Sequence, residues 1–125
     1  MRLTFLGKES QPNQSPTLFA SDQGSYVVQG WIVSDPAVLA RLDISDDETV
    51  VEVPPGLMAH LSKDGLDGEV RCLVPPIVAV LDNGNYVVQG KRVSDVEALG
   101  QMDLPDHETC VEVLKSAVAA LVVGG

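Results

Sequence analysis

One seven-residue stretch decides the fold, and it occurs twice. Gly24-Ser-Tyr-Val-Val-Gln-Gly30 returns 60 residues later as Gly84-Asn-Tyr-Val-Val-Gln-Gly90. Around it, residues 16–61 align with residues 76–121 without a gap, and close to half of the aligned positions are identical. Similarity at a fixed offset is typical of an internal repeat, whose copies share one local fold. The sequence therefore predicts a tandem duplication.

Each copy begins with the pattern of a β-hairpin. A short apolar run, at 17–20 or 77–81, precedes a turn that carries Asp and Gly. A β-branched run follows, at 26–28 or 86–88. The second turn contains Asn-Gly, the strongest short hairpin signal, because both residues accept positive φ. The glycines that close the repeated stretch indicate a bulge or a close approach of two backbones.

A helix, a strand and a second helix follow the hairpin in each copy. Ser34-Asp35-Pro36 reads as a helix start with a capping side chain and a proline in the first turn, and Ser94 to Glu97 has the capping-box spacing. The apolar positions of these two short helices are Val38, Leu39 and Leu42, and Ala98, Leu99 and Met102. The strands are expected at 49–53 and 109–113, and the closing helices at 56–61 and 116–122.

The repeat sets the expected domain organisation. Residues 1–63 form the first unit and residues 64–125 the second, with a linker at 63–68. One further strand is expected before each copy, at 3–6 and 70–74, and a mobile loop at 7–15. A unit of this length is marginal alone, so the two units should share one core. The predicted class is α+β, a tandem duplication of a β-hairpin–helix–strand–helix unit packed with pseudo-twofold symmetry.

Charge and composition narrow the function classes. The chain carries 18 acidic and 8 basic residues, a net charge of −10, which disfavours direct binding of nucleic acid or an anionic membrane. No apolar run is long enough to cross a bilayer, and the first residues do not form a signal peptide. Cys72 and Cys110 are then expected to be reduced thiols. We expect a cytoplasmic protein without a cofactor.

The two copies differ most informatively where Trp31-Ile32 is replaced by Lys91-Arg92. A position that accepts lysine in one copy is an improbable deep-core site in the other. Trp31 and Ile32 are therefore candidates for a surface that binds a partner, where tryptophan is favoured. In the alternative interpretation, the N-terminal segment from Leu3 to Leu6 folds over Trp31.

The acidic segments before the second strands are the other candidate surface. Asp46, Asp47 and Glu48 are candidates for contact with a partner protein, and a D-x-x-D-x-E spacing recurs at Asp103, Asp106 and Glu108. These loops lack the glycine and the ligand number of a calcium loop, so no metal site is expected. His107 and Cys110 are too few for a zinc site or a catalytic thiol, and Cys110 reads as a small buried residue. No catalytic motif is present, and the role of Gly124-Gly125 stays open.

Two resemblances accompany these patterns. The first half of the chain resembles a group of small uncharacterised acidic actinobacterial proteins associated with helix-turn-helix regulators. The stretches that carry this resemblance are Leu3-Thr-Phe-Leu-Gly7, Pro16-Thr-Leu18, Tyr26-Val-Val-Gln-Gly-Trp31 and Ser34-Asp35-Pro36. That resemblance implies a regulatory accessory role. The stretch from Gly24 to Val53 is similar to the swapped-hairpin transition-state regulators and antitoxins. This chain departs from them by extra residues between Val28 and Leu42, and it lacks their DNA-contacting arginines.

The sequence favours a non-enzymatic regulatory or adaptor module that binds another protein, with a DNA-binding regulator as a candidate partner. A homodimer is compatible with this interpretation. The alternative is a small-molecule or metal-binding protein, or an enzyme, that uses the crevice between the two units, where ligand sites often form. The first hypothesis predicts an exposed apolar patch, and the second predicts an enclosed pocket with converging polar groups.

Overall fold

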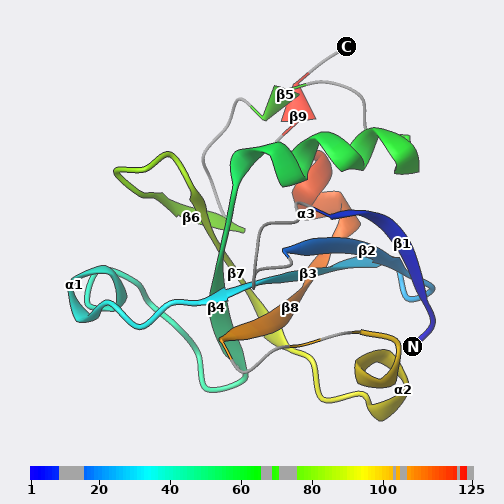
Figure 1. Cartoon of the computed structure of the whole chain (residues 1–125), viewed down its shortest axis with the longest axis horizontal. Coiled ribbons are helices and arrows are strands. Elements are labelled where there is room, and N and C mark those ends of the chain that lie inside the picture. The colour runs from blue at the N-terminus through cyan, green and yellow to red at the C-terminus, as the bar shows by residue number, and fades with distance from the viewer. Residues whose placement is uncertain are drawn as a thin grey trace.

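The chain folds around one antiparallel sheet with a few short helices (Figure 1). The computed structural model describes residues 1–8, 16–65, 69–70, 76–102, 104, 107–120 and 122–123. The main sheet has seven strands: β1 (Leu3–Lys8), β2 (Thr17–Ser21), β3 (Ser25–Ile32), β4 (Glu48–Val53), β6 (Ile77–Val80), β7 (Tyr86–Arg92) and β8 (Glu108–Leu114). A mixed class was predicted, and the observed class is mixed and dominated by the sheet.

The helices are short, and a small second sheet lies apart from the main one. The helical segments are α1 (Pro36–Leu39), the 3₁₀ helix η1 (Pro55–Asp64), α2 (Val96–Gly100) and α3 (Lys115–Ala119). The small sheet pairs β5 (Glu69–Val70) with β9 (Val122–Val123). In the described part of the chain, no helix is both long and apolar enough to cross a membrane.

The longest strand pairings join the first half of the chain to the second. β3 pairs with β8 over seven residues, from Ser25 to Trp31, and β4 pairs with β7 over six, from Glu48 to Val53. Within a half, β3 pairs with β4, and β7 with β8, over only two residues each. The four strands therefore form a closed ring of pairings, in which each register recurs at an offset of 60 residues.

The two predicted hairpins are confirmed. β2 pairs with β3, and β6 with β7, across turns whose glycines have positive φ, 74° at Gly24 and 89° at Gly84. Of the two explanations for the glycines that end the repeated stretch, the close approach is correct. A Cβ at Gly30 would lie 2.6 Å from the Glu52 carbonyl oxygen, and one at Gly90 would lie 2.5 Å from that of Glu112.

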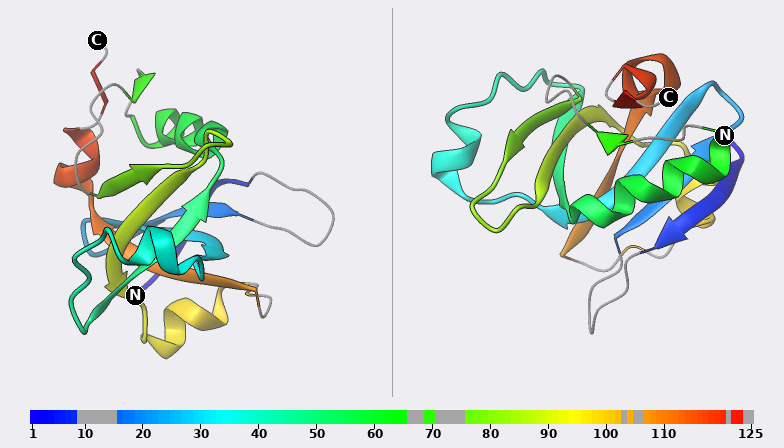
Figure 2. Two further views of the ribbon diagram at one scale, coloured as in Figure 1. Left: turned by 90° about the vertical axis from the view of Figure 1, so that its left-hand side faces the viewer. Right: turned by 90° about the horizontal axis from the view of Figure 1, so that it is seen from above.

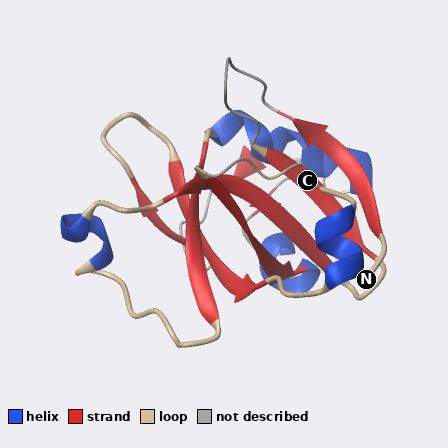
Figure 3. Cartoon of the chain, turned by 60° about the horizontal axis from the view of Figure 1, so that its bottom comes forward, coloured by secondary structure: helices blue, strands red, loops and turns tan. Residues whose placement is uncertain are grey.

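Apolar side chains pack on both sides of the sheet. The largest cluster combines residues of both halves, among them Tyr26, Val51, Val88 and Val111, under η1 and α3. α2 packs on a second cluster around Val27, and α1 packs on a third cluster around Val38, Val50 and Val87. Figure 2 shows η1 and α3 together on one side of the sheet, and Figure 3 shows α1 set apart from the other helices.

The start of α1 is as predicted, with a capping side chain followed by proline, whereas the start of α2 differs from the prediction in the residue that caps it. Asp35 Oδ1 accepts from the Ala37 N–H at 2.9 Å, and Asp95 Oδ1 accepts from the Glu97 and Ala98 N–H groups. The capping box at Ser94 was therefore wrong. Asp95 lies one residue closer to the helix and satisfies two first-turn donors itself, and the Glu97 carboxylate bonds to the N-terminus instead.

Several predicted boundaries also need correction. The helix expected at 116–122 ends at Ala119, and Val122 belongs to β9. The strand expected at 70–74 is represented by β5, outside the main sheet, and 71–75 lie beyond the described residues. Of the loop expected at 7–15, Gly7 and Lys8 belong to β1, and the rest is likewise not described. Lys63 and Asp64, expected in the linker, end η1.

Candidate functional site

The five predicted partner residues do not lie in one place. Ile32 ends β3, and its paired residue on β4 is Val51. Glu48 begins β4 three residues earlier, roughly 10 Å along the strand at about 3.3 Å per residue. Asp46 and Asp47 are exposed in the turn before it. The structure therefore divides the prediction between two surfaces.

Trp31 is half-buried between two other strands. Its paired residues are Glu52 on β4 and Glu108 on β8. Among the described residues, the Trp31 Nε1 atom has no hydrogen-bond partner, although it is shielded from solvent. The segment that was considered as its cover, from Leu3 onward, lies along β2 instead.

One surface is a groove between α1 and the β6–β7 hairpin, the α1–β6 groove. Its volume is about 490 Å³, and its lining includes Ile32, Val80, Asp35, Glu52, Asp82 and Arg41. The helix α1 places Asp35 there because this residue is its N-cap, and the turn after β6 places Asp82 there. Three carboxylates and one guanidinium thus line the groove, so its polar border is acidic.

Two of the apolar side chains that line the α1–β6 groove are exposed to solvent. Ile32 is 48% exposed and Val80 is 45% exposed, and both line this groove. Glu52, at its rim, accepts hydrogen bonds from the Asn85 side chain at 2.7 Å and from that of Asn83 at 3.4 Å. The groove can therefore bury apolar side chains of a partner, while the carboxylates of Asp35, Glu52 and Asp82 attract a cationic group of that partner.

The other surface is a groove of about 420 Å³ beside β7, β8 and α3, the β7–β8 groove. Glu48, Lys91 and Glu112 line it with the apolar Leu114 and Ala117. Lys91 is paired in register with Glu48 on one side and with Glu112 on the other. The Gln89 amide donates to Glu48 Oε1 at 2.9 Å and to the Asp43 carbonyl at 3.0 Å, which fixes that carboxylate.

The counterpart of the β7–β8 groove at the offset of 60 contains Trp31 in place of Lys91. There the Gln29 amide donates to Glu108 Oε1 at 2.8 Å, as Gln89 does to Glu48. Gln29 and Glu108 are buried, whereas Gln89 and Glu48 are half-buried. Trp31 therefore lies beside a buried Gln29–Glu108 pair, whereas Lys91 lies in an accessible groove beside the half-buried Gln89–Glu48 pair.

Only part of the residues considered for metal or thiol chemistry lies in the described part of the chain. Cys110 is buried, as predicted, and its burial raises the pKa of the thiol to about 11, so it is protonated at neutral pH. His107 Nε2 lies 3.4 Å from Glu108 Oε2. Across the described residues no cluster of metal-ligating side chains occurs, while Cys72, Asp103 and Asp106 lie outside them.

Sequence reasoning missed most of the residues that line the two grooves. Asp35 was read only as part of a helix start, and Val80 and Asp82 only as a strand and its turn. The sequence signal for Asp35 and Asp82 was present, because both recur at the offset of 60 as Asp95 and Asp22. No known protein family matches this chain, and no curated protein or solved structure is significantly similar to it.

Proposed function

We propose that this protein is a non-enzymatic regulatory or adaptor module that binds another protein through the α1–β6 groove. The observation that carries the proposal is the meeting of Ile32 and Val80, both about half exposed, in one groove with an acidic rim. Apolar side chains gathered within a polar rim are typical of protein interaction sites. A DNA-binding regulator is the candidate partner, and its basic character would complement the rim.

We also propose that residues 1–63 and 64–125 are two copies of one duplicated unit, packed with pseudo-twofold symmetry around one core. The support is that the pairing of β3 with β8 matches that of β4 with β7 residue for residue at the offset of 60. Such a module functions in the cytoplasm.

The test compares two matched surface variants. Ile32→Arg places in the groove the residue that stands at 92 in the second half, and Val96→Arg changes an apolar residue of α2 that is 83% exposed. Both exposed positions should change the free energy of unfolding by less than about 1 kcal/mol. Wild-type protein and both variants are used to capture partners from an extract of the native cell, which are identified by mass spectrometry.

The proposal is supported if the wild type and Val96→Arg capture a protein that Ile32→Arg does not capture. The purified partner should then bind the wild type and Val96→Arg, but not Ile32→Arg. Equal capture by all three proteins contradicts the use of this groove. Sedimentation of the purified proteins shows whether the partner is a second copy of the chain, since a homodimer would then dissociate in Ile32→Arg.

The second candidate function is the binding of a small molecule in the β7–β8 groove. Its support is that Lys91, whose paired residues on the two neighbouring strands are Glu48 and Glu112, lines this groove together with them and with the apolar Leu114 and Ala117. These groups suit a ligand that carries an amino group, a carboxylate and an apolar part. Leucine is a direct probe: amide shifts at β7 and β8 that disappear in Lys91→Met would favour this function, and unchanged spectra at millimolar leucine would oppose it.

A further inference from the structure

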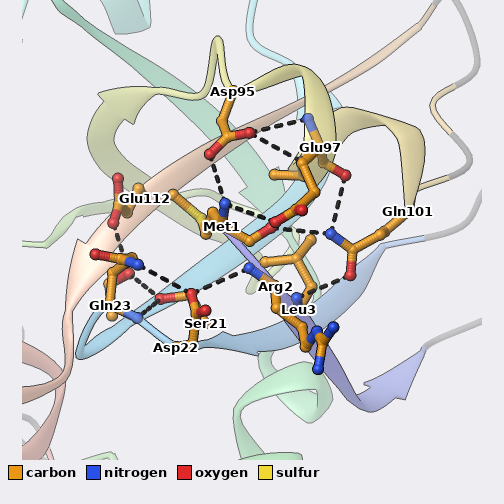
Figure 4. A network of polar contacts seen from close by, with 12 residues as sticks. Met1, Arg2, Leu3, Ser21, Asp22, Gln23, Asp95, Glu97, Gln101 and Glu112 are labelled. Atoms are coloured by element: carbon orange, nitrogen blue, oxygen red, sulfur yellow. Dashed lines mark hydrogen bonds and ion pairs between the residues drawn. The ribbon is translucent and has the colours of Figure 1, made fainter.

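The first residues of the chain occupy a site on the second half of the molecule (Figure 4). The Met1 amino group donates to Asp95 Oδ2 at 2.8 Å and to Glu97 Oε1 at 2.9 Å. The Gln101 side chain accepts from the Leu3 N–H and donates to the Met1 carbonyl, each at 2.9 Å. The helix α2 and its two caps thus hold one side of an extended segment.

The strand β2 and the turn after it hold the other side of this segment. The Arg2 N–H donates to Asp22 Oδ1, and the Asp22 N–H donates to the Arg2 carbonyl, both at 3.0 Å. From Leu3 onward, β1 pairs antiparallel with β2. The site therefore recognises an extended backbone with a positive charge at its end, between a strand and a helix.

The α1–β6 groove is the counterpart of this site at the offset of 60. Its lining residues Asp35, Arg41 and Asp82 stand 60 positions from three members of that network, which are Asp95, Gln101 and Asp22. β6 corresponds to β2, but among the described strands it pairs with β7 alone, at the end of the sheet. Among the described residues, β6 therefore has no strand along the edge that corresponds to the one β1 covers on β2.

The backbone of β6 is oriented to accept another strand. Leu81 donates its N–H to the Asn85 carbonyl at 2.9 Å, toward the partner strand of the hairpin. Successive peptide groups of an extended chain point to opposite edges. The N–H and carbonyl of Val80 therefore point away from β7, to the edge that lines the groove. An edge of this kind is what an extended peptide pairs with when it adds to a sheet.

We propose that the α1–β6 groove binds an extended segment of a partner protein, which adds to β6 as an antiparallel strand and places a basic group between Asp35 and Asp82. This inference rests on the proposed function and names the form in which the partner binds. The charge of the groove supports it, because Asp35, Glu52 and Asp82 outnumber Arg41.

A second copy of the chain is a poorer occupant than a different protein. The N-terminal segment of each copy is already held by the Met1 and Arg2 contacts and by the pairing of β1 with β2. The same segment supplied as a free peptide can still occupy the groove, because Arg41, in place of Gln101, can donate to a peptide carbonyl as Gln101 does to that of Met1.

The experiment uses the full chain and a peptide with the sequence of residues 1–8, Met-Arg-Leu-Thr-Phe-Leu-Gly-Lys, as the probe of strand addition. Amide shifts of the labelled protein are followed up to about 1 mM peptide, a range suited to weak complexes. Two further peptides carry an N-methyl group at the Thr4 or at the Phe5 amide. In the chain, the Leu3 N–H faces α2, so by alternation the Thr4 N–H faces the strand and the Phe5 N–H does not.

We expect shifts at β6 and α1, and about a tenfold loss of affinity for the peptide methylated at Thr4, as for one lost backbone hydrogen bond. The peptide methylated at Phe5 should bind as the unmodified one does. Asp35→Asn and Asp82→Asn should each weaken binding several-fold. Asp46→Asn, which changes an exposed carboxylate outside the groove, should leave it unchanged.

Four outcomes would overturn the inference: no binding at about 1 mM, shifts confined to β2 and α2, equal binding of both methylated peptides, or a self-association that Ile32→Arg abolishes. The failure of strand addition can be told from that of the adaptor proposal. If Ile32→Arg still loses a captured partner while both methylated peptides bind equally, the groove binds protein through side chains, and strand addition alone is wrong.

Discussion

At the scale of single residues, Gly30 and Gly90 determine how closely the central strands approach. A Cβ at Gly30 would meet the Glu52 carbonyl and the Val53 side chain at 2.6 and 2.7 Å. Backbone atoms of a paired strand cannot move aside without loss of ladder hydrogen bonds. Both glycines are identical in the two halves because both positions face the same steric limit, not because they perform chemistry.

We therefore expect Gly30→Ala to lower the free energy of unfolding by about 2–4 kcal/mol, the range of a strongly overpacked site. Gly100→Ala is the matched control, because a Cβ there meets nothing within 4 Å and alanine favours the helix. Urea denaturation of both variants measures the difference. Equal stability of the two proteins would contradict the close approach.

Trp31 is the residue at which the two halves diverge most in character. The double substitution Trp31→Lys with Ile32→Arg gives β3 the residues that β7 has at these positions. The new lysine is then paired with Glu52 and Glu108, as Lys91 is paired with Glu48 and Glu112. Because Trp31 is only half-buried, we expect a loss of about 1–2 kcal/mol in the free energy of unfolding. A loss above about 4 kcal/mol in urea denaturation would instead place Trp31 in the core.

At the scale of elements, α1 and α2 start alike but are supported differently. Both have an aspartate N-cap, yet only Asp95 also pairs with the Met1 amino group. The hydrogen bonds that the Met1 amino group donates to the Asp95 and Glu97 carboxylates raise its pKa from 8.0 to about 10, and the same contact lowers the pKa of Asp95. The attachment of α2 to the N-terminus is therefore pH-dependent.

The sign of this dependence follows from the two shifts. The amino group has the higher pKa in the folded state, so its stabilisation is complete below pH 8.0 and is lost as the pH rises through about 10. The stabilisation from Asp95, whose folded pKa is lower, is present above 3.8 and is lost as the pH falls through the folded value. Melting temperatures measured from pH 7 to 11 should fall more steeply for the native chain than for an N-acetylated chain.

Acetylation is a selective control. Ionisation of the buried Cys110 thiol, whose pKa is raised, also destabilises the protein in the alkaline range, but it does so equally in the native and acetylated chains. Parallel pH profiles for the native and acetylated chains would show that the Met1 contacts do not contribute to stability.

At the scale of the whole molecule, the two halves depend on each other for their sheet. β3 pairs with β8 over seven residues and β4 with β7 over six, whereas the pairings of β3 with β4 and of β7 with β8, within the halves, cover only two residues each. The largest apolar cluster likewise combines Val51 and Val53 with Val111 and Val113. A half separated from the other would expose both the strand edges and this cluster.

We expect residues 1–63 and residues 64–125, produced as separate fragments, to be unfolded alone and to fold when mixed. Circular dichroism of each fragment and of the mixture is the measurement, with sedimentation to show a one-to-one complex. The Gly30→Ala fragment provides a matched control, because it should complement more weakly. A cooperative thermal transition of either fragment alone would show that the units fold independently.

Three features that depend on neighbouring residues could be predicted from the sequence alone: the hairpin turns at Gly24 and Gly84, the order of strands and helices, and the burial of Cys110. These follow from local φ preferences and from the alternation of apolar residues. Only the tertiary structure decided that β3 pairs with β8 and β4 with β7, because backbone hydrogen bonds are the same for any pair of strands and do not encode a partner. It also separated Ile32 from Glu48, and it brought Asp35 and Asp82 into one groove beside β6, the last described strand of the sheet. The distance along a chain does not reveal which side chains the folded sheet brings together.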